Sequence, residues 1–495
     1  MKCAFSLVVI VPFVFSVSAD ARDPITSSVV KIHATLREPD FDRPWSKGSP
    51  EEISASGVII EGKRILTNAH VVLYSSQIFV QADQSTERVP AKVKAVAPAI
   101  DLAIVEVEKP SFFDGRPPLA VADGLPAVKQ TVNVYGYPMG GEQISVTQGI
   151  VSRIEFTEVN DFVRGLRVQI DAALNPGNSG GPAVADGKIV GLVFSKFSQG
   201  ENIGYLLAAD EIRMFLKDIQ DGAYKGKPQI WDYLLSTENE ALRAKLGLEK
   251  ETGIVVYLPF SSSPDYPLKK WDVVTHIGGE PIDSQCNVKV NDSLRLQFQY
   301  LVPKLAKDGR VKLTIIRDRK SLDVLVPVRP DGNFVMPFLM GRYPRYFIYG
   351  PMVFMPASQE LAIQLAARGE PWVSMLMSTQ SPLLARQMDH PTFDGEEIVT
   401  LGYGLLPHKT SKGYNPGSFS VVSHVNGTAV RNMRHLVTLL RDAKGEFLTV
   451  DLAGACPPMV FHRDEVLKST EDILSDEGVR KQYSDDLESV WHPKK

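Results

Sequence analysis

The chain is poor in cysteine: its 495 residues include only Cys3, Cys286 and Cys456. Cys3 lies in an N-terminal segment that we expect to be removed, and the other two fall in regions that we interpret as separate domains. An exported protein with so few cysteines is not a scaffold held together by disulfides. Its stability must come from hydrophobic cores, which a chain of this length can form.

Neither sign of charge is in marked excess. The chain has 54 Lys and Arg against 58 Asp and Glu, which gives a formal net charge of −4. Proteins that bind nucleic acid typically present a basic face, so the composition gives no reason to expect nucleic acid as a partner. The nine histidines show no metal-ligand spacing, and we expect neither a metal nor another cofactor.

Long apolar runs are absent except for one at the N-terminus, from Ala4 to Val17. The run follows Lys2 and leads into Val17-Ser18-Ala19, the pattern of a signal peptide that is cleaved after Ala19. It is too short to span a bilayer comfortably, which takes ~20 residues, although an uncleaved anchor is the alternative. We therefore predict a signal peptide over residues 1–19, export to the periplasm or the extracellular space, and no stable membrane span after cleavage.

A glycine-rich turn with a central serine is the most informative stretch of the sequence. It reads Asn-Pro-Gly-Asn-Ser-Gly-Gly-Pro, places Ser179 between Gly177 and Gly180, and follows a strand-like run that ends near Ile170. A nucleophilic serine needs a tight turn that presents its hydroxyl and leaves neighbouring N–H groups free for an oxyanion. Glycine permits such a turn because it adopts positive φ readily.

Two upstream motifs supply the partners that such a serine requires. Thr67-Asn68-Ala69-His70-Val71-Val72 provides a histidine, and Asp101 opens the apolar run Leu102-Ala103-Ile104-Val105. A hydroxyl becomes a useful nucleophile when a base accepts its proton, and a carboxylate fixes the tautomer of that base. Singly, the three residues could be an idle surface hydroxyl, a core histidine and a strand-end cap. Together, in the order His70, Asp101, Ser179, they predict a catalytic triad of the chymotrypsin type.

These motifs closely resemble those of the HtrA/Deg group of trypsin-like serine proteases, whose members carry PDZ domains after the protease domain. The resemblance extends over roughly residues 25–460, and the loop containing Trp45 together with the long second half is most similar to the plant-type Deg branch with an atypical second PDZ domain. It places the nucleophile on Ser179, the base on His70 and the orienting acid on Asp101. It also implies an oxyanion hole formed by the backbone of Gly177, Asn178 and Ser179.

Short strand-like runs separated by Gly and Pro fill the region from Ile25 to about Gln220, which indicates an all-β barrel or sandwich. The resemblance implies two six-stranded antiparallel barrels with the catalytic residues in the cleft between them. We expect a mostly β, chymotrypsin-like protease domain followed by two α+β PDZ-like domains. The predicted segments are the signal peptide (1–19), the protease domain (25–220), a first PDZ-like domain (224–330), a divergent second one (336–460) and a charged helical tail (461–495).

The first PDZ-like domain is predicted from Trp271-Asp272-Val273-Val274-Thr275-His276-Ile277, which resembles a PDZ strand, and from two expected helices, 238–246 and 294–307. The resemblance places the loop that binds a ligand carboxylate at Gln229, Ile230, Trp231 and Asp232. Because Trp231 replaces the usual glycine, its bulk would crowd the backbone nest. Capture of a C-terminal carboxylate is therefore in doubt, and we expect this domain to act mainly in assembly or in binding internal apolar segments.

The resemblance also indicates which side chains would surround the primary specificity pocket: Ala173, Val193, Phe194 and Ser195. None of them is acidic, so we expect the pocket to select small or medium aliphatic side chains rather than Lys or Arg. The predicted function is an ATP-independent serine endopeptidase that cleaves unfolded or damaged polypeptides for quality control in the cell envelope. A homo-oligomer built on trimers is implied. The alternatives are a PDZ-bearing holdase chaperone and an oligomeric scaffold with little proteolysis.

Overall fold

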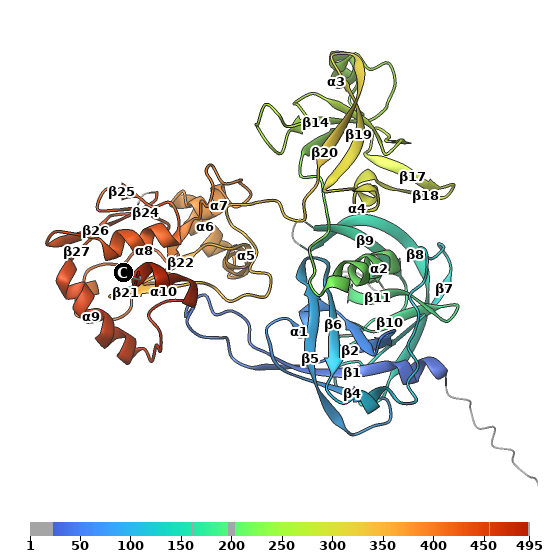
Figure 1. Ribbon diagram of the computed structural model, residues 1–495, viewed down its shortest axis with the longest axis horizontal. Coiled ribbons are helices and arrows are strands. Elements are labelled where there is room, and N and C mark those ends of the chain that lie inside the picture. The colour runs from blue at the N-terminus through green and yellow to red at the C-terminus, as the bar shows by residue number, and fades with distance from the viewer. Residues whose placement is uncertain (1–22, 161–162, 197–202, 455, 494–495) are drawn as a thin grey trace, which may run out of the picture.

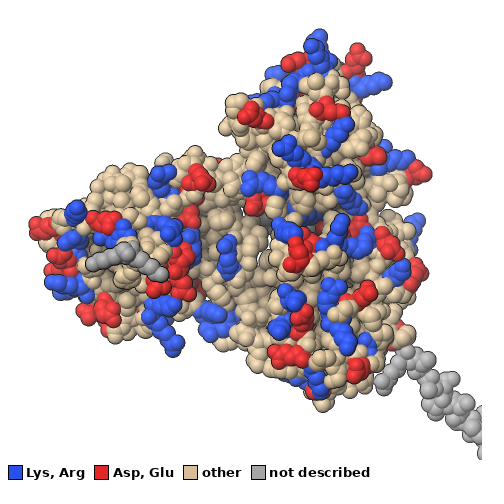
Figure 2. Space-filling model, in the orientation of Figure 1, with Lys and Arg blue, Asp and Glu red and all other residues tan. Residues whose placement is uncertain are grey.

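The computed structural model describes residues 23–160, 163–196, 203–454 and 456–493, so the predicted signal peptide at 1–19 lies outside the described residues. The chain forms three lobes: a double barrel, a smaller sheet domain above it and a larger mixed domain beside it (Figure 1). Acidic and basic side chains are interspersed over the visible face of all three (Figure 2). Within the described part of the chain, no helix is long and apolar enough to cross a membrane.

The first barrel closes in the strand order β1-β2-β3-β6-β5-β4, with every pairing antiparallel. Its interior is filled by the alternate, mostly β-branched residues of these strands, among them Ile32, Val80 and Val105, all fully buried. The four-residue helix α1 (Ala69–Val72) follows β3. The strands are β1 (Val29–Leu36), β2 (Glu51–Ile60), β3 (Arg64–Thr67), β4 (Ser75–Ala82), β5 (Arg88–Ala97) and β6 (Leu102–Val107).

The second barrel has the same design, in the order β10-β11-β12-β9-β8-β7, and is again antiparallel throughout. Helix α2 (Ala209–Asp218) follows it and buries Ile212 and Phe215 against both barrels. The predicted pair of six-stranded barrels is thereby confirmed. The strands are β7 (Thr131–Gly136), β8 (Ser145–Asn160), β9 (Val163–Ile170), β10 (Pro182–Ala185), β11 (Lys188–Lys196) and β12 (Gly204–Ala208).

The next lobe is a sheet in the order β13-β14-β15-β19-β20, with β16 paired to β15 and a separate hairpin β17-β18. Its elements are β13 (Tyr233–Ser236), α3 (Glu240–Leu246), β14 (Ile254–Leu258), β15 (Val273–Ile277), β16 (Glu280–Pro281), β17 (Asn287–Asn291), β18 (Leu294–Gln297), α4 (Val302–Leu305), β19 (Arg310–Arg317) and β20 (Lys320–Pro327).

The prediction of a helix over residues 294–307 is wrong. Residues 294–297 form a strand, 298–301 a 3-10 turn, and only α4 is α-helical. The apolar residues Leu294, Leu296, Phe298 and Tyr300 recur at every second position, which is the period of a strand. Pro303 lies within the expected helix, where it would remove a hydrogen bond except in the first turn, and α4 starts just before it.

The last lobe has two small sheets, β21-β22-β23 and β25-β24-β26-β27. Phe347, Tyr349 and Phe354 lie in its core, together with Val466 and Val490 from the chain's final segments. Its elements are β21 (Phe347–Tyr349), β22 (Met352–Pro356), α5 (Gln359–Ala367), α6 (Glu370–Ser378), α7 (Pro382–Ala385), β23 (Val399–Leu401), β24 (Val422–Val425), β25 (Thr428–Ala429), α8 (Met433–Arg441), β26 (Phe447–Leu452), β27 (Met459–His462), α9 (Arg463–Asp476) and α10 (Glu488–Trp491).

Two consecutive acidic residues of α2 fasten the middle lobe to the double barrel. Asp210 accepts hydrogen bonds from Tyr300 (3.1 Å) and Lys304 (2.7 Å). Glu211 accepts one from the N–H of Leu166 (2.8 Å) and one from Lys227 (2.6 Å), whose ammonium also donates to the Arg164 carbonyl. The Lys227 and Glu211 side chains are 5% and 2% exposed, so this ion pair is buried.

Replacing Lys227 by methionine should strongly destabilise the fold, because Glu211 would keep its burial and lose its counter-charge. Breaking one side of a buried pair typically costs about 3–5 kcal/mol. Chemical denaturation measures the effect. The matched control is Lys188→Met, which breaks an exposed pair with Asp123 and should leave the denaturation midpoint nearly unchanged. Equal shifts in the two variants would contradict a special role for the buried pair.

Candidate active site

His70 follows β3 and Asp101 directly precedes β6. Because these two strands pair antiparallel, both residues lie at the same end of the first barrel, where they meet through two hydrogen bonds. The Nδ1 of His70 lies 2.8 Å from Asp101 Oδ2, and the His70 backbone N–H donates to Asp101 Oδ1 at 2.8 Å. The Asp101 side chain is 4% exposed and that of His70 is 48% exposed. The carboxylate therefore fixes the ring from the buried side and leaves the other ring nitrogen facing outward.

Asp101 is itself held by the backbone around it. It caps the turn 98–100 in a left-handed conformation, with φ at 54°. Asn68, two residues before His70, donates its side-chain amide to the Asp101 carbonyl at 3.0 Å. The histidine segment and the aspartate segment are thus joined by backbone and side-chain bonds alike, which limits the motion of the imidazole.

The turn that carries Ser179 is docked on the first barrel through Ser56, a fully buried residue of β2. The Ser56 N–H donates to the Ser179 carbonyl (2.9 Å), and its hydroxyl donates to the Gly177 carbonyl (2.8 Å). Gly180 has φ at 81°, and a Cβ at this position would lie 2.2 Å from the Ser56 carbonyl oxygen and 2.3 Å from the Thr67 hydroxyl. Thr67 is the last residue of β3 and lies three residues before His70. The close contact of Gly180 with Thr67 therefore places the Ser179 turn next to the His70 segment.

Two backbone N–H groups of this turn are free to bind an anion. Among the described residues, none accepts a hydrogen bond from the N–H of Gly177 or of Ser179. The N–H of Asn178 differs, because it donates to the Asn175 carbonyl at 3.1 Å within the turn. The oxyanion hole expected from Gly177, Asn178 and Ser179 therefore has two available donors, and the Asn178 amide closes the turn instead.

The Ser179 hydroxyl makes no hydrogen bond with His70 in the described structure. Such bonds are often long or poorly aligned before substrate binds and become shorter in the complex. No group of three or more His, Cys, Asp or Glu side chains in the described ranges is arranged to hold a metal ion.

The electrostatics of His70 depend on Asp101. Burial by itself lowers the pKa of the imidazole, but the hydrogen bond to Asp101 and the charge of that carboxylate outweigh it, and the net effect raises the pKa above its ordinary 6.5. A raised pKa means that the ring becomes a stronger base. The imidazole can therefore accept a proton on its other nitrogen, because the carboxylate beside Nδ1 stabilises the positively charged ring.

Comparison with known proteins fits this geometry. Residues 55–192 match the trypsin-like peptidase domain family, and residues 335–486 match a PDZ domain family. Protease Do-like 2, chloroplastic, of Arabidopsis thaliana is 32% identical over 470 residues, covering 93% of this chain and 75% of the relative. The chain belongs to the HtrA/Deg family. It is a serine endopeptidase with PDZ domains, and its similarity to Arabidopsis proteins agrees with the predicted plant-type branch.

A second curated relative is similar over most of its own length. Protease Do-like 4, mitochondrial, of Arabidopsis thaliana is 32% identical over 447 residues, covering 88% of this chain and 81% of the relative. Among solved structures, the HtrA-type protease AlgW with tripeptide aligns with 62% of this chain and 94% of its own, at 21% identity and a TM-score of 0.49.

The four residues expected around the specificity pocket of this HtrA/Deg protease do not share one environment. Val193 is buried in the core of the second barrel, and its backbone bonds to Gly180 and Gly181 hold the Ser179 turn. Phe194 packs under the Arg167 guanidinium, 4.7 Å from the ring centre. Ala173 is exposed, and its carbonyl accepts a hydrogen bond from Thr147. Ser195 lies in β11, paired with Tyr205.

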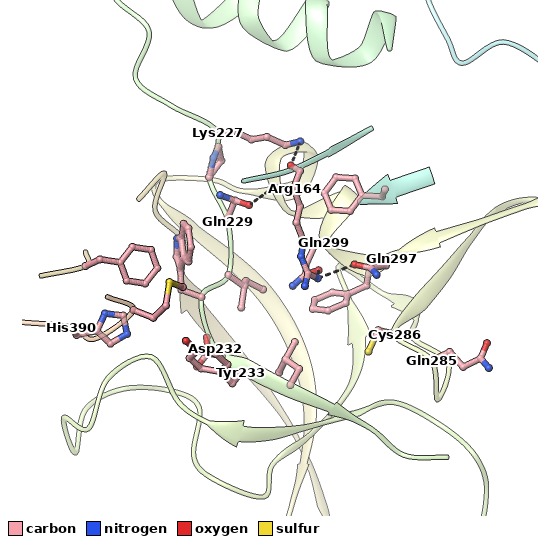
Figure 3. A pocket seen from close by; sticks show the side chains of 18 residues that line it. Arg164, Lys227, Gln229, Asp232, Tyr233, Gln285, Cys286, Gln297, Gln299 and His390 are labelled. Atoms are coloured by element: carbon pink, nitrogen blue, oxygen red, sulfur yellow. Dashed lines mark hydrogen bonds between the residues drawn. The ribbon is translucent and has the colours of Figure 1, made fainter. Parts of the chain in front are cut away.

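The loop expected to bind a carboxylate lines a cavity of about 390 Å³ where the first PDZ-like domain meets the second barrel and the last lobe (Figure 3). Ile230 belongs to the domain core. The Trp231 indole donates to the Arg329 carbonyl (3.0 Å) and packs edge-on against Phe334. Asp232 is buried and accepts hydrogen bonds from the Phe260 N–H and the Tyr266 hydroxyl. The loop thus already contains a carboxylate of its own.

The opposite wall of this cavity is cationic and polar. Arg164, from β9 of the protease domain, points into it and donates to Gln297 (2.9 Å) and Gln299 (2.8 Å) (Figure 3). Gln229 accepts a hydrogen bond from the Arg164 N–H and forms a bridge with Arg329. Met388 and His390 of the last lobe also line the cavity, so all three lobes contribute to it, which the sequence motifs did not indicate.

Ser56 is the main residue that the sequence motifs missed. It lies in β2, which begins with two glutamates and ends in the apolar run Val58-Ile59-Ile60, and a serine in such a strand could equally be a tolerated small residue. The available signal was the run Ser54-Ala55-Ser56-Gly57, whose small side chains leave room for close approach of another backbone. Only the structure shows that the approaching backbone is the Ser179 turn.

We predict that His70 titrates above 6.5, and that Asp101→Asn moves its pKa below this value. The substitution removes the carboxylate charge, and burial then outweighs a hydrogen bond to a neutral amide, as it does at His33. NMR of the imidazole C–H signals against pH measures both titrations. His33 serves as the internal control: burial lowers its pKa, and its hydrogen-bond partner is Gln81 rather than a carboxylate. If His70 titrates at the same pH in both proteins, Asp101 does not set its basicity.

Proposed function

We propose that Ser179, His70 and Asp101 act as a catalytic triad that hydrolyses peptide bonds through an acyl-enzyme. His70 Nε2 accepts the proton of the Ser179 hydroxyl while Oγ attacks the scissile carbonyl. The tetrahedral intermediate collapses when His70 returns the proton to the leaving amine, which breaks the C–N bond. Water then attacks the ester with His70 again as the base, and this releases the acid and regenerates the serine.

The observation that carries this proposal is the docking of the Ser179 turn beside the His70 segment through Ser56 and Thr67. The free N–H groups of Gly177 and Ser179 would stabilise the oxyanion, and losing one such donor typically costs about 10²–10³ in rate. Asp101 would orient the imidazole and stabilise its protonated form, in agreement with the raised pKa of His70.

The substrates that we propose are unfolded or damaged polypeptides, cleaved without ATP for protein quality control. A protease domain joined to two PDZ-like domains supports this, because PDZ domains bind extended peptide segments at a sheet edge. Small or medium aliphatic residues before the cleaved bond, and a homo-oligomer built on trimers, are part of the proposal. The relatives named above are chloroplastic and mitochondrial, whereas the N-terminal segment of this chain favours export to the periplasm or beyond.

Ser179→Ala should reduce cleavage of an unfolded protein such as β-casein by several orders of magnitude, since the members of a triad act as a unit. Folding should be nearly unaffected, because only one hydroxyl is lost. Product formation followed by gel electrophoresis measures the rate, with Ser152→Ala, an exposed serine of β8, as the matched control.

Digestion at the wild-type rate by Ser179→Ala would refute the triad. If instead the wild type and Ser179→Ala both lack turnover yet suppress aggregation of an unfolding client protein, the holdase alternative would be favoured. Size-exclusion chromatography of the same samples tests the trimer-based oligomer.

We also predict that peptides with a free C-terminal carboxylate bind the first PDZ domain no better than their amides. Trp231 occupies the expected loop, and the buried carboxyl of Asp232 takes up the Phe260 N–H. Fluorescence anisotropy with full-length Ser179→Ala measures both affinities. A strong preference for the free acid would contradict this, and Arg164→Gln would then show whether the guanidinium in the cavity is its source.

A further inference from the structure

The segment that follows His70 is held by a distant part of the chain. Helix α1 ends after Val72, and the next residues, Leu73 and Tyr74, lead into β4. Tyr74 has φ at 59°, a left-handed conformation that costs a non-glycine residue on the order of 1–3 kcal/mol unless its surroundings impose it. The surroundings that hold Tyr74 belong to the second PDZ domain rather than to the barrel alone.

Tyr343 is the centre of this contact. Its ring packs on that of Tyr74 with 5.5 Å between centroids, and its hydroxyl donates to the Arg37 carbonyl at 2.7 Å. Arg37 in turn donates its N–H to the Tyr74 carbonyl at 3.0 Å. The Lys47 ammonium, from the same connection between β1 and β2 as Arg37, lies 4.6 Å from the centre of the Tyr343 ring. Tyr343 therefore links the end of β1 to the segment directly after the catalytic helix.

Leu73 is held by the same segment. Gly341 has φ at 82°, and a Cβ there would lie 2.8 Å from Leu73 Cδ1, so the leucine packs directly on the glycine backbone. The Tyr74 hydroxyl approaches the Arg342 carbonyl at 3.5 Å. Residues 341–343 thus touch both residues that follow α1, and Asp101 holds His70 from the other side.

The rest of the contact between these domains lies farther along the connection between β1 and β2, which reaches from the barrel to the last lobe (Figure 1). Phe41 is buried in the core of that lobe with Met336 and Leu361. Asp42 pairs with Arg368 at 2.7 Å, and Trp45 packs edge-on against Tyr346 at 6.4 Å. These contacts join the domains without touching the residues after α1.

We propose that Tyr343 is a positioning residue for His70: the second PDZ domain completes the active site by fixing the Leu73–Tyr74 segment. The inference rests on the proposed role of His70 as the general base. Undocking of residues 341–343 would leave substrate binding in place and move the imidazole. A displacement of about 1 Å in a reacting group can cost ~10²-fold in rate.

The test compares Tyr343→Ala with Trp45→Ala, which removes an aromatic contact from the same domain interface away from α1. We expect Tyr343→Ala to lower kcat for β-casein by about 10- to 100-fold with KM within about twofold of wild type, and to slow labelling of Ser179 by a fluorophosphonate in parallel. Trp45→Ala should keep both rates within about twofold. Equal losses in the two variants, or an unchanged kcat in Tyr343→Ala, would overturn the proposal.

Tyr343→Phe keeps the ring on Tyr74 and loses the hydrogen bond to Arg37, so it covers the case in which Tyr343→Ala does not fold. It should lower kcat by about 2- to 10-fold with KM unchanged, and an unchanged kcat would overturn the proposal. Ser179→Ala is measured alongside. If Ser179→Ala retains turnover, the proposed triad fails; if it loses turnover while Tyr343→Ala does not, only the positioning role fails.

Discussion

At the candidate active site, one buried serine joins the two barrels. The Ser56 N–H donates to the Ser179 carbonyl, and its hydroxyl donates to the Gly177 carbonyl. The same hydroxyl accepts a hydrogen bond from the Tyr137 N–H (2.8 Å). The Ser56 carbonyl accepts one from the Thr67 hydroxyl. The N–H and the hydroxyl of this residue therefore bond to the second barrel, whereas its carbonyl bonds to β3 of the first barrel. A buried polar group without partners would cost free energy, so the geometry of the Ser179 turn is coupled to the closure of both barrels.

Much of the protease domain was predictable from the sequence because local patterns and motifs agree there. Alternating β-branched residues indicate strands, and the turn around Ser179 needs glycines at positions where φ is positive and another backbone lies within contact distance. The pairing of His70 with Asp101 also followed from the motifs, since each residue lies at the end of a strand-like run. The family resemblance assigned the Asn178 amide to the oxyanion hole. Its hydrogen bond to the Asn175 carbonyl depends on the path of the turn, which the motif does not reveal.

The PDZ-like domains were less predictable, for physical reasons that differ from place to place. Residues 294–300 carry a strand period that the helix-forming residues after them obscured, and Pro303 limits the helix to one turn. The cavity at the first PDZ domain includes Arg164 from the second barrel, and no local pattern marks a side chain that will face another domain. The contacts of Tyr343 are of the same kind, because they depend on how whole lobes dock.

The connection between β1 and β2 also constrains the order in which the molecule can be made. Tyr343 follows its partner Arg37 by 306 residues and Arg368 follows Asp42 by 326 residues. A ribosome that adds ~5–20 residues per second needs about 15–65 s to cover such a separation. Throughout that interval Phe41 has no core to enter, and the segment after His70 lacks its outer support. During synthesis the double barrel therefore lacks the contacts of Tyr343 and Arg368 until the last third of the chain has been made.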